Sequence, residues 1–284
     1  MSTRPATVAS EQPGHPDAHR WMGAIAYDLG DMNRALDELS IVSRLAPTDD
    51  RPYVLKAQRH ADFEQFRDAV EAGSQALALH PPEPVREDVA TELVRARMRI
   101  RDYAAALKTL PQARRSALSL ALEAECHLSL GDAVSANARL EEARSLDPEE
   151  PSVLRLFGRM ELDAGRPEAA LEPLRSVLKL DPQDHESRHH LAQALRLLGR
   201  TAEADAEARR SANIVKLKLE MANLNIEAIN RPQDADVRDR IAAVCSKLGK
   251  PQLAESWRKA AAACRQRSRG AETPSTHLES VPPK

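Results

Sequence analysis

Aromatic residues make up only 3% of this 284-residue chain, although 42% of it is hydrophobic, with alanine and leucine prominent. A chain so rich in alanine and so poor in aromatic side chains favours close helix–helix packing over a β-sandwich core. Long apolar runs are lacking as well, because no stretch approaches the ~20 residues that span a bilayer. We therefore expect a helical protein without a membrane-spanning segment.

Cysteine and net charge are also scarce. The three cysteines, Cys126, Cys245 and Cys264, are scattered within helical patterns, which predicts reduced thiols in the core and not a disulfide framework. The 41 basic residues nearly balance the 43 acidic ones. Bulk attraction to nucleic acid or to an anionic membrane is therefore not expected.

Both ends of the chain are polar and contain proline. Residues 1–15 and 269–284 have the composition of disordered tails. The first residues contain no apolar segment of the kind found in secretory signals, so we expect a cytoplasmic location.

A 34-residue unit recurs between these ends, and its most regular copy is Pro151–Asp184. It predicts two amphipathic helices joined at Gly165, with Pro182 ending the second one. The repeats lie at 16–49, 50–83, 87–116, 117–150, 151–184 and 185–230, and a last repeat lies at 235–268. In the second repeat Glu64 replaces the turn glycine, and in the third Pro111 should cut the second helix short.

One alanine recurs eight residues into the second-helix segment of each unit. The column consists of Ala35, Ala69, Ala106, Ala136, Ala170, Ala204 and Ala254. A small side chain at every equivalent position predicts close approach of each helix to its partner, which a larger side chain would prevent.

A second small-residue column runs through the first helices, at Gly23, Ala57, Ala124, Gly158, Ala192 and Ala242. Together with the turn glycines, the alanine column and the closing prolines, it resembles the tetratricopeptide repeat (TPR) family. The resemblance implies an all-α, right-handed solenoid of about seven hairpins, whose first helices line a concave surface that holds a peptide or helix of another protein. Val94 departs from the small-residue column, and Lys216 replaces a closing proline.

Without that proline, the second helix of repeat six should continue to about Asn230, adding about 24 Å at 1.5 Å per residue. Apolar residues follow a seam along it, at Ala208, Ala212, Val215, Leu219, Ala222, Ile226 and Ile229. Two interpretations are open. Either the last repeat folds back over this seam, or the helix pairs with a second copy through Val215, Leu219, Ala222 and Ile226.

Spacing places residues two, five, nine and twelve of each unit on one side of its first helix. The candidate groove residues are Arg51, Gln58, Thr91, Arg95, Arg155, Arg159, His189, Gln193 and Arg196. Because arginine suits carboxylates, we expect this groove to bind an acidic or carboxylate-bearing segment of a partner protein. The alternative is that nearby acids balance solvated arginines. The Lys/Asn/Arg set with which some TPR proteins clamp a terminal carboxylate is not found.

Other chemistry has weaker support in the sequence. His185 and His189 share a helix face with His190 beside them, but no cysteine or carboxylate motif completes a metal site. No nucleophile–base pair or phosphate-binding loop is visible, so we expect neither enzyme activity nor a cofactor. Two alternatives remain: an RNA-binding helical repeat, which near-neutral net charge makes less favourable, and an accessory subunit of an enzyme or secretion complex.

Overall fold

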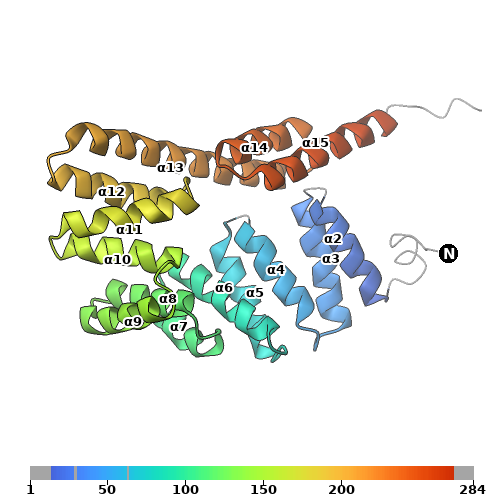
Figure 1. Ribbon diagram of the computed structural model, residues 1–284. Helices are drawn as coiled ribbons and strands as arrows, with labels where there is room; N and C mark the ends of the chain where they lie inside the picture. Colours follow the sequence, from blue (N-terminus) through green and yellow to red (C-terminus); the bar gives the residue numbers. More distant parts are fainter. Residues whose placement is uncertain (1–13, 29–30, 63, 272–284) are drawn as a thin grey trace, which may run out of the picture.

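The computed structural model describes residues 14–28, 31–62 and 64–271. Within these ranges the chain is a succession of antiparallel helices with no strand (Figure 1). No helix among the described residues is both long and apolar enough to cross a membrane. The expectation of an all-α solenoid is confirmed.

Each sequence repeat forms a hairpin of two helices (Figure 1). In chain order they are α2 (Pro16–Asp28) with α3 (Met32–Leu45), α4 (Arg51–Asp62) with α5 (Phe66–Ala78), α6 (Val85–Arg99) with α7 (Tyr103–Thr109) and the 3₁₀ turn η1 (Leu110–Gln112), α8 (Ala117–Ser129) with α9 (Ala133–Leu146), α10 (Pro151–Asp163) with α11 (Pro167–Leu180), α12 (His185–Leu197) with α13 (Thr201–Asn230), and α14 (Ala235–Lys247) with α15 (Pro251–Ala271).

Helix boundaries differ slightly from those expected at two places. Helix α6 begins at Val85, two residues before the expected start at Glu87, because Pro84 occupies its N-cap position. Helix α15 continues to Ala271, into the segment expected to be a tail. The early end of α7 before Pro111 is as expected. Residues 1–13 and 272–284, which were expected to be disordered, lie outside the described residues.

From the second repeat to the last, the turn inside the hairpin contains one residue in the left-handed region. Gly165 and Gly199 have φ of +72° and +73°, which glycine adopts without steric cost. Glu64 and Arg101 take the same position in the second and third repeats, with φ of 59° and 63°. The hairpin turn therefore forms in these two repeats without a glycine.

The alanine column lies at the interface inside each hairpin. Ala35, Ala106, Ala136, Ala170, Ala204 and Ala254 are fully buried, and Ala69 is nearly so. The first-helix column is equally tight at Gly158, where an added Cβ would lie 2.6 Å from Leu174 Cγ. The small side chains set the separation of the helices, as expected.

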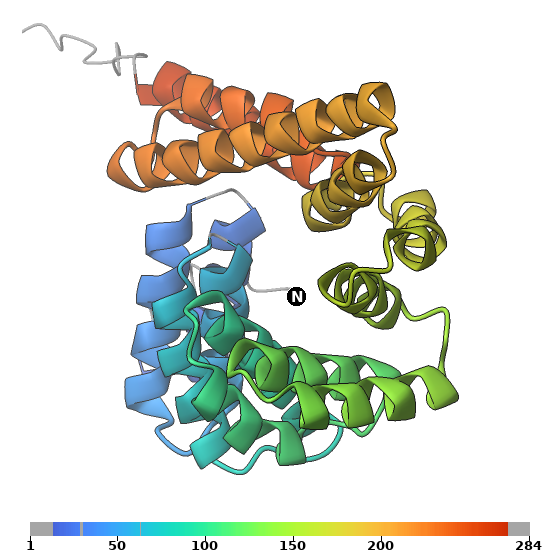
Figure 2. The same cartoon turned by 90° about the vertical axis from the view of Figure 1, so that its left-hand side faces the viewer.

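The solenoid curves toward its first helices. In the middle of the chain α6 contacts α8, α8 contacts α10 and α10 contacts α12, and these first helices line the inner side of the curve (Figure 2). The concave surface is thus formed by the helices that carry the candidate groove residues.

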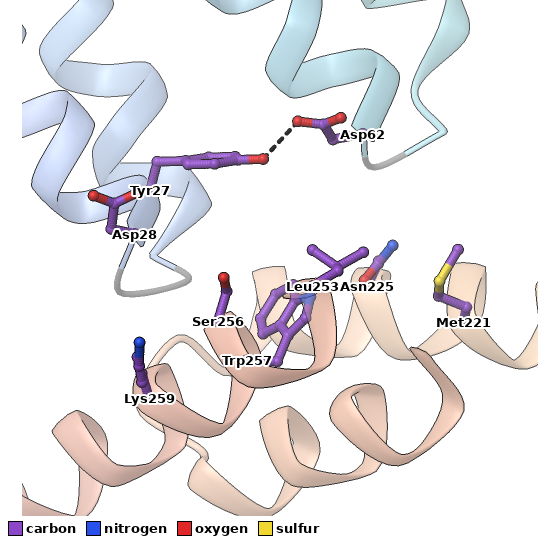
Figure 3. Close-up of a pocket in the computed structure, with 9 residues that line it drawn as sticks. All are labelled: Tyr27, Asp28, Asp62, Met221, Asn225, Leu253, Ser256, Trp257 and Lys259. Carbon is purple, nitrogen blue, oxygen red and sulfur yellow. Dashed lines mark hydrogen bonds between the residues drawn. The ribbon is translucent and has the colours of Figure 1, made fainter. Parts of the chain in front are cut away.

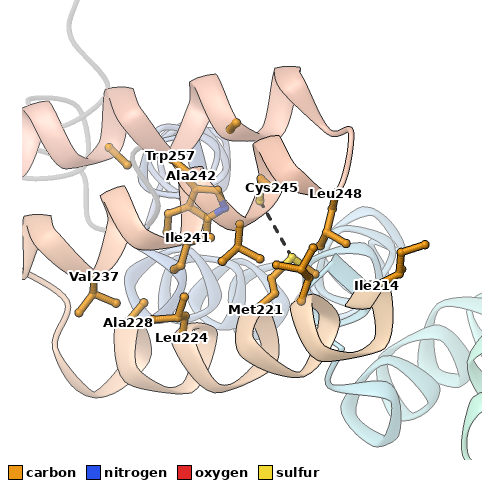
Figure 4. Close-up of a cluster of buried hydrophobic side chains, with 14 residues drawn as sticks. Ile214, Met221, Leu224, Ala228, Val237, Ile241, Ala242, Cys245, Leu248 and Trp257 are labelled. Atoms are coloured by element: carbon orange, nitrogen blue, oxygen red, sulfur yellow. Dashed lines mark hydrogen bonds between the residues drawn. The ribbon is translucent and has the colours of Figure 1, made fainter. Parts of the chain in front are cut away.

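Helix α13 continues through the missing proline to Asn230, as expected, but its apolar faces are used differently. Its buried face consists of Ile214, Leu217, Met221, Leu224 and Ala228, which pack with α14 and α15 around Trp257 (Figure 4). Along the expected seam Val215, Leu219 and Ile226 are exposed. The interpretation that the last repeat covers this seam is therefore wrong, because the repeat covers the neighbouring apolar stripe.

The curvature brings the two ends of the array together. Tyr27 of α2 and Leu36 of α3 pack against the core of α13, α14 and α15. Figures 1 and 2 both show the first hairpin beside the last one. The described helices thus form a nearly closed ring with the concave surface inside.

Candidate binding surface

The middle of the concave surface is an ion-pair network centred on Arg155. This α10 side chain lies 3.2 Å from Asp184 and 3.7 Å from Glu186, both at the start of α12. Asp184 also caps α12, since its carboxylate accepts hydrogen bonds from the Glu186 and Ser187 amides. Arg155 therefore ties two successive first helices together as well as facing the groove.

Glu125 of α8 completes this network from the other side. Burial raises the pKa of the Glu125 carboxyl, and the charge of Arg155 only partly offsets that effect. Burial also acts to raise the pKa of Asp184, but Arg155 and the Ser187 hydrogen bonds outweigh it, so that pKa is lowered. Glu125 and Asp184 consequently differ in pKa, since that of Glu125 is raised and that of Asp184 is lowered.

A second polar cluster lies nearby, where α12 faces α13. Lys218 Nζ donates a hydrogen bond to His185 Nδ1 over 3.0 Å. Burial and the Lys218 charge lower the pKa of His185, which keeps the imidazole neutral. Burial lowers the pKa of Lys218 as well. His190 is similar, because burial is the largest cause of its lowered pKa.

All nine candidate groove residues are exposed or half-buried. Each of the five arginines has an acidic neighbour in the same chain, pairing Arg51 with Asp49, Arg95 with Glu92, Arg155 with Asp184, Arg159 with Asp163, and Arg196 with Asp205. Thr91 donates a hydrogen bond to the Glu87 carbonyl, and His189 lies edge-on to His190, which also contacts Gln193. Balancing acids are therefore a feature of this surface.

The structure brings some candidates together and separates others. Gln58 shares a cavity of about 550 Å³ between α4 and α6 with Asp88 and Glu92, so that stretch of the surface is acidic. Arg155 and Arg159 lie with His190 and Glu125, where α8, α10 and α12 meet. The basic character expected of the groove is concentrated in this second region.

Sequence reasoning missed Glu125 and Lys218. Glu125 is the ninth residue of the fourth repeat, so the spacing that selected Arg159 in the fifth repeat would also have selected it. Lys218 lies on a second helix, and it reaches His185 only because α13 continues past the usual end of the repeat. No spacing within one repeat indicates that contact.

Among the described residues, neither the histidines nor the cysteines form a metal site. Across residues 14–28, 31–62 and 64–271, no group of three or more His, Cys, Asp or Glu side chains is placed to hold a metal ion. The three cysteines are buried without a disulfide, as expected. Burial raises the pKa of the Cys126 thiol to about 12, so it stays protonated and unreactive at neutral pH.

Comparison with known proteins confirms the resemblance stated above. Residues 155–213 match the tetratricopeptide repeat family. A chain in the crystal structure of the APC/C hetero-tetramer Cut9–Hcn1 superposes with a TM-score of 0.57 at 15% identity, over 92% of this chain and 49% of that one. The present chain thus spans about half the length of that neighbour.

A second solved structure is similar in fold. PilW, a widely conserved type IV pilus biogenesis factor, superposes with a TM-score of 0.54 at 14% identity, over 70% of this chain and 93% of that one. Comparison with curated proteins gives no match. The similarities establish the solenoid fold.

Proposed function

We propose that this array of tetratricopeptide repeats is a non-enzymatic scaffold whose concave surface binds an acidic or carboxylate-bearing segment of a partner protein. The observation that carries the proposal is the position of Arg155 and Arg159, one turn apart on α10 at the centre of the concave surface. Their side chains are 27% and 36% exposed, so both can be reached from the groove. A guanidinium takes a carboxylate through two parallel hydrogen bonds.

The two arginines differ in how strongly the chain's own acids hold them. Arg155 pairs with Asp184, whose side chain is only 9% exposed and also caps α12. Among the described residues Arg159 pairs with Asp163, at 3.8 Å, and the Asp163 side chain is 62% exposed. Such exposed pairs contribute only about 0.2–1 kcal/mol. A ligand carboxylate therefore displaces Asp163 from Arg159 more readily than it displaces Asp184 from Arg155.

Neighbouring side chains on α12 can extend the contact. His189 and Gln193 are exposed one turn apart, and the neutral His190 imidazole lies beside them. The Gln193 amide and the neutral His190 imidazole offer hydrogen-bond donors without adding charge, and His190 lies within reach of the Arg159 charge. Arg51, Gln58, Thr91, Arg95 and Arg196 would contact parts of a partner segment farther along the surface.

Peptide selection followed by charge reversal tests the proposal. A displayed library of random peptides is selected against the chain, and the selected peptides are measured by fluorescence anisotropy. We expect Asp/Glu-rich peptides or free C-termini to be enriched, and Arg159→Glu to weaken them about tenfold or more. Arg210→Glu is the matched control, because Arg210 lies on the second helix α13 with its side chain 63% exposed. Equal enrichment of neutral and basic peptides contradicts the proposal.

The exposed stripe on α13 carries a separate proposal, that two copies pair through Val215, Leu219, Ala222 and Ile226. Leu219 and Ile226 are 63% and 59% exposed two turns apart, as at the contact face of a helix pair. Light scattering at rising concentration should show a mass above the 31.3 kDa of one chain. Leu219→Glu should keep the chain monomeric, and a monomer at every concentration without the substitution rejects the pairing.

A further inference from the structure

A pocket of about 320 Å³ lies where the first hairpin meets the last one, outside the groove considered above (Figure 3). Tyr27, Asp28 and Asp62 line one wall, from α2 and α4. The opposite wall comes from α13 and α15, with Met221, Asn225, Leu253, Ser256, Trp257 and Lys259. Its volume is at the lower end of the range for small-molecule sites.

Asn225 is the feature that packing alone does not explain. Its residue is only 5% exposed, in a helix face that is otherwise apolar. The Oδ1 atom is buried without a hydrogen-bond partner, and the amide nitrogen points toward the pocket (Figure 3). Since an unsatisfied buried polar group costs about 1–3 kcal/mol, a buried amide aimed into a cavity points to a ligand.

The two carboxylates on the first wall, Asp62 and Asp28, differ in their hydrogen bonding. Tyr27 donates a 2.5 Å hydrogen bond to Asp62, and the Arg59 guanidinium stacks on the Tyr27 ring at 3.2 Å. Burial and this contact with Asp62 raise the pKa of Tyr27 to about 12. Asp28, by contrast, has no hydrogen bond or ion pair with any described residue and faces the pocket.

Lys259 is the counterpart of Asp28 on the opposite wall. It faces the same pocket, exposed, and forms no ion pair with the described residues, Asp28 included. The pocket therefore presents an unpaired carboxylate on one side and an unpaired ammonium on the other. Trp257 lies beside this pair, and the apolar part of the floor continues from it through Leu253 to Met221 (Figure 3).

We propose that this pocket binds a free amino acid with an apolar or aromatic side chain. Asp28 would receive the α-ammonium group and Lys259 the α-carboxylate, while the side chain packs on Trp257 and Met221. The unpartnered Asn225 Oδ1 atom would accept a hydrogen bond from the α-ammonium group. Such a ligand contacts both ends of the array at once, so its binding stabilises the closed ring. The proposal concerns a different site from the groove and does not depend on it.

Trp257 provides the readout. The chain has two tryptophans, so Trp21→Phe leaves Trp257 as the only one, and Trp21 is 63% exposed and absent from the pocket. L-Phenylalanine and L-leucine are titrated while Trp257 emission is followed. We expect a saturable change with both. N-Acetyl-L-phenylalanine, which lacks the ammonium, and L-phenylalaninamide, which lacks the carboxylate, should each bind about tenfold more weakly.

Substitutions assign each contact. Asp28→Asn should weaken L-phenylalanine about tenfold and remove the difference between it and its acetylated form, and Lys259→Gln should do the same for the amide. Asn225→Leu should raise the thermal midpoint while weakening binding, which separates loss of a contact from loss of folding. Asp37→Asn, outside the pocket, is the control. No saturable change, or equal affinity for the blocked forms, overturns the proposal.

Discussion

At the scale of single residues, space beside the small side chains decides where this array tolerates change. A Cβ added at Gly158 would lie 2.6 Å from Leu174 Cγ, a separation that real atoms do not adopt. A Cβ at Gly73 would lie 3.5 Å from Leu93, which is an ordinary contact. Close packing therefore requires a glycine at Gly158, whereas the space at Gly73 admits a methyl group.

We expect Gly158→Ala to lower the free energy of unfolding by about 1–3 kcal/mol, because α10 and α11 must separate to admit the methyl group. Gly73→Ala should raise it by up to about 1 kcal/mol, because alanine loses less backbone entropy on folding. Urea denaturation followed by circular dichroism measures both. If both variants changed the free energy of unfolding in the same direction, the space between α10 and α11 would not be what distinguishes Gly158 from Gly73.

The buried carboxyl of Glu125 should make stability depend on pH. Its pKa is raised on folding, chiefly by burial, so above the ordinary glutamate pKa the folded chain holds this proton more tightly than the unfolded chain. The contribution of Glu125 to stability therefore falls as pH rises. Relative to Glu125→Gln, the original chain should lose stability as the pH rises above about 4, the ordinary pKa of a glutamate. A constant difference between the two contradicts this reading of Glu125.

At the scale of the helix, α13 shows what a sequence pattern can and cannot settle. The absence of a closing proline at Lys216 correctly predicted a continuous helix to Asn230. Of the two interpretations of its apolar seam, the one in which the last repeat covers it was wrong, because α13 has two adjacent apolar stripes, one containing Leu219 and the other Leu217 and Met221. Which stripe the last repeat covers depends on the turn at Arg231, a tertiary feature that helical periodicity does not encode.

The same limit applies to the candidate surface. The residue spacing predicted Arg155 and Arg159 on one side of a first helix, and both are half-buried on α10. It did not predict that Asp184, the N-cap residue of α12, lies beside Arg155, because that contact depends on how successive hairpins are rotated. The alanine column needed no such information, since its partner lies within the same hairpin.

Restoring the usual proline tests the continuity of α13. Lys216→Pro removes one backbone hydrogen bond and places the ring against the Ala212 carbonyl, at a cost of about 3 kcal/mol or more. We expect limited proteolysis to cut near residue 216 and to release the last repeat. Lys216→Ala is the control, because the Lys216 side chain is exposed and only the backbone differs. Resistance of the proline variant to cleavage would contradict the expected break.

At the scale of the whole molecule, contact between the first and last hairpins fixes the shape of the concave surface. That contact is small and centres on Tyr27, whose ring packs on the core around Trp257. An interface held by few residues can be opened by one substitution. The contact that closes the ring is therefore less stable than the packing within and between successive hairpins.

We expect Tyr27→Ala to open the ring without unfolding the hairpins. Small-angle X-ray scattering should show a larger radius of gyration, while helical circular dichroism stays the same. Trp21→Ala is the matched control, since Trp21 is an exposed aromatic residue on the same helix. An unchanged radius for Tyr27→Ala would mean that other contacts hold the ends together.

Closure also bears on how such a chain can evolve. An open solenoid can gain or lose a repeat by unequal recombination, because each unit touches only its neighbours. Here a duplicated or deleted 34-residue unit would rotate Tyr27 away from the core around Trp257, and the ends would no longer meet. Selection that preserves the ring would therefore preserve the number of repeats, even while the sequence of each repeat drifts.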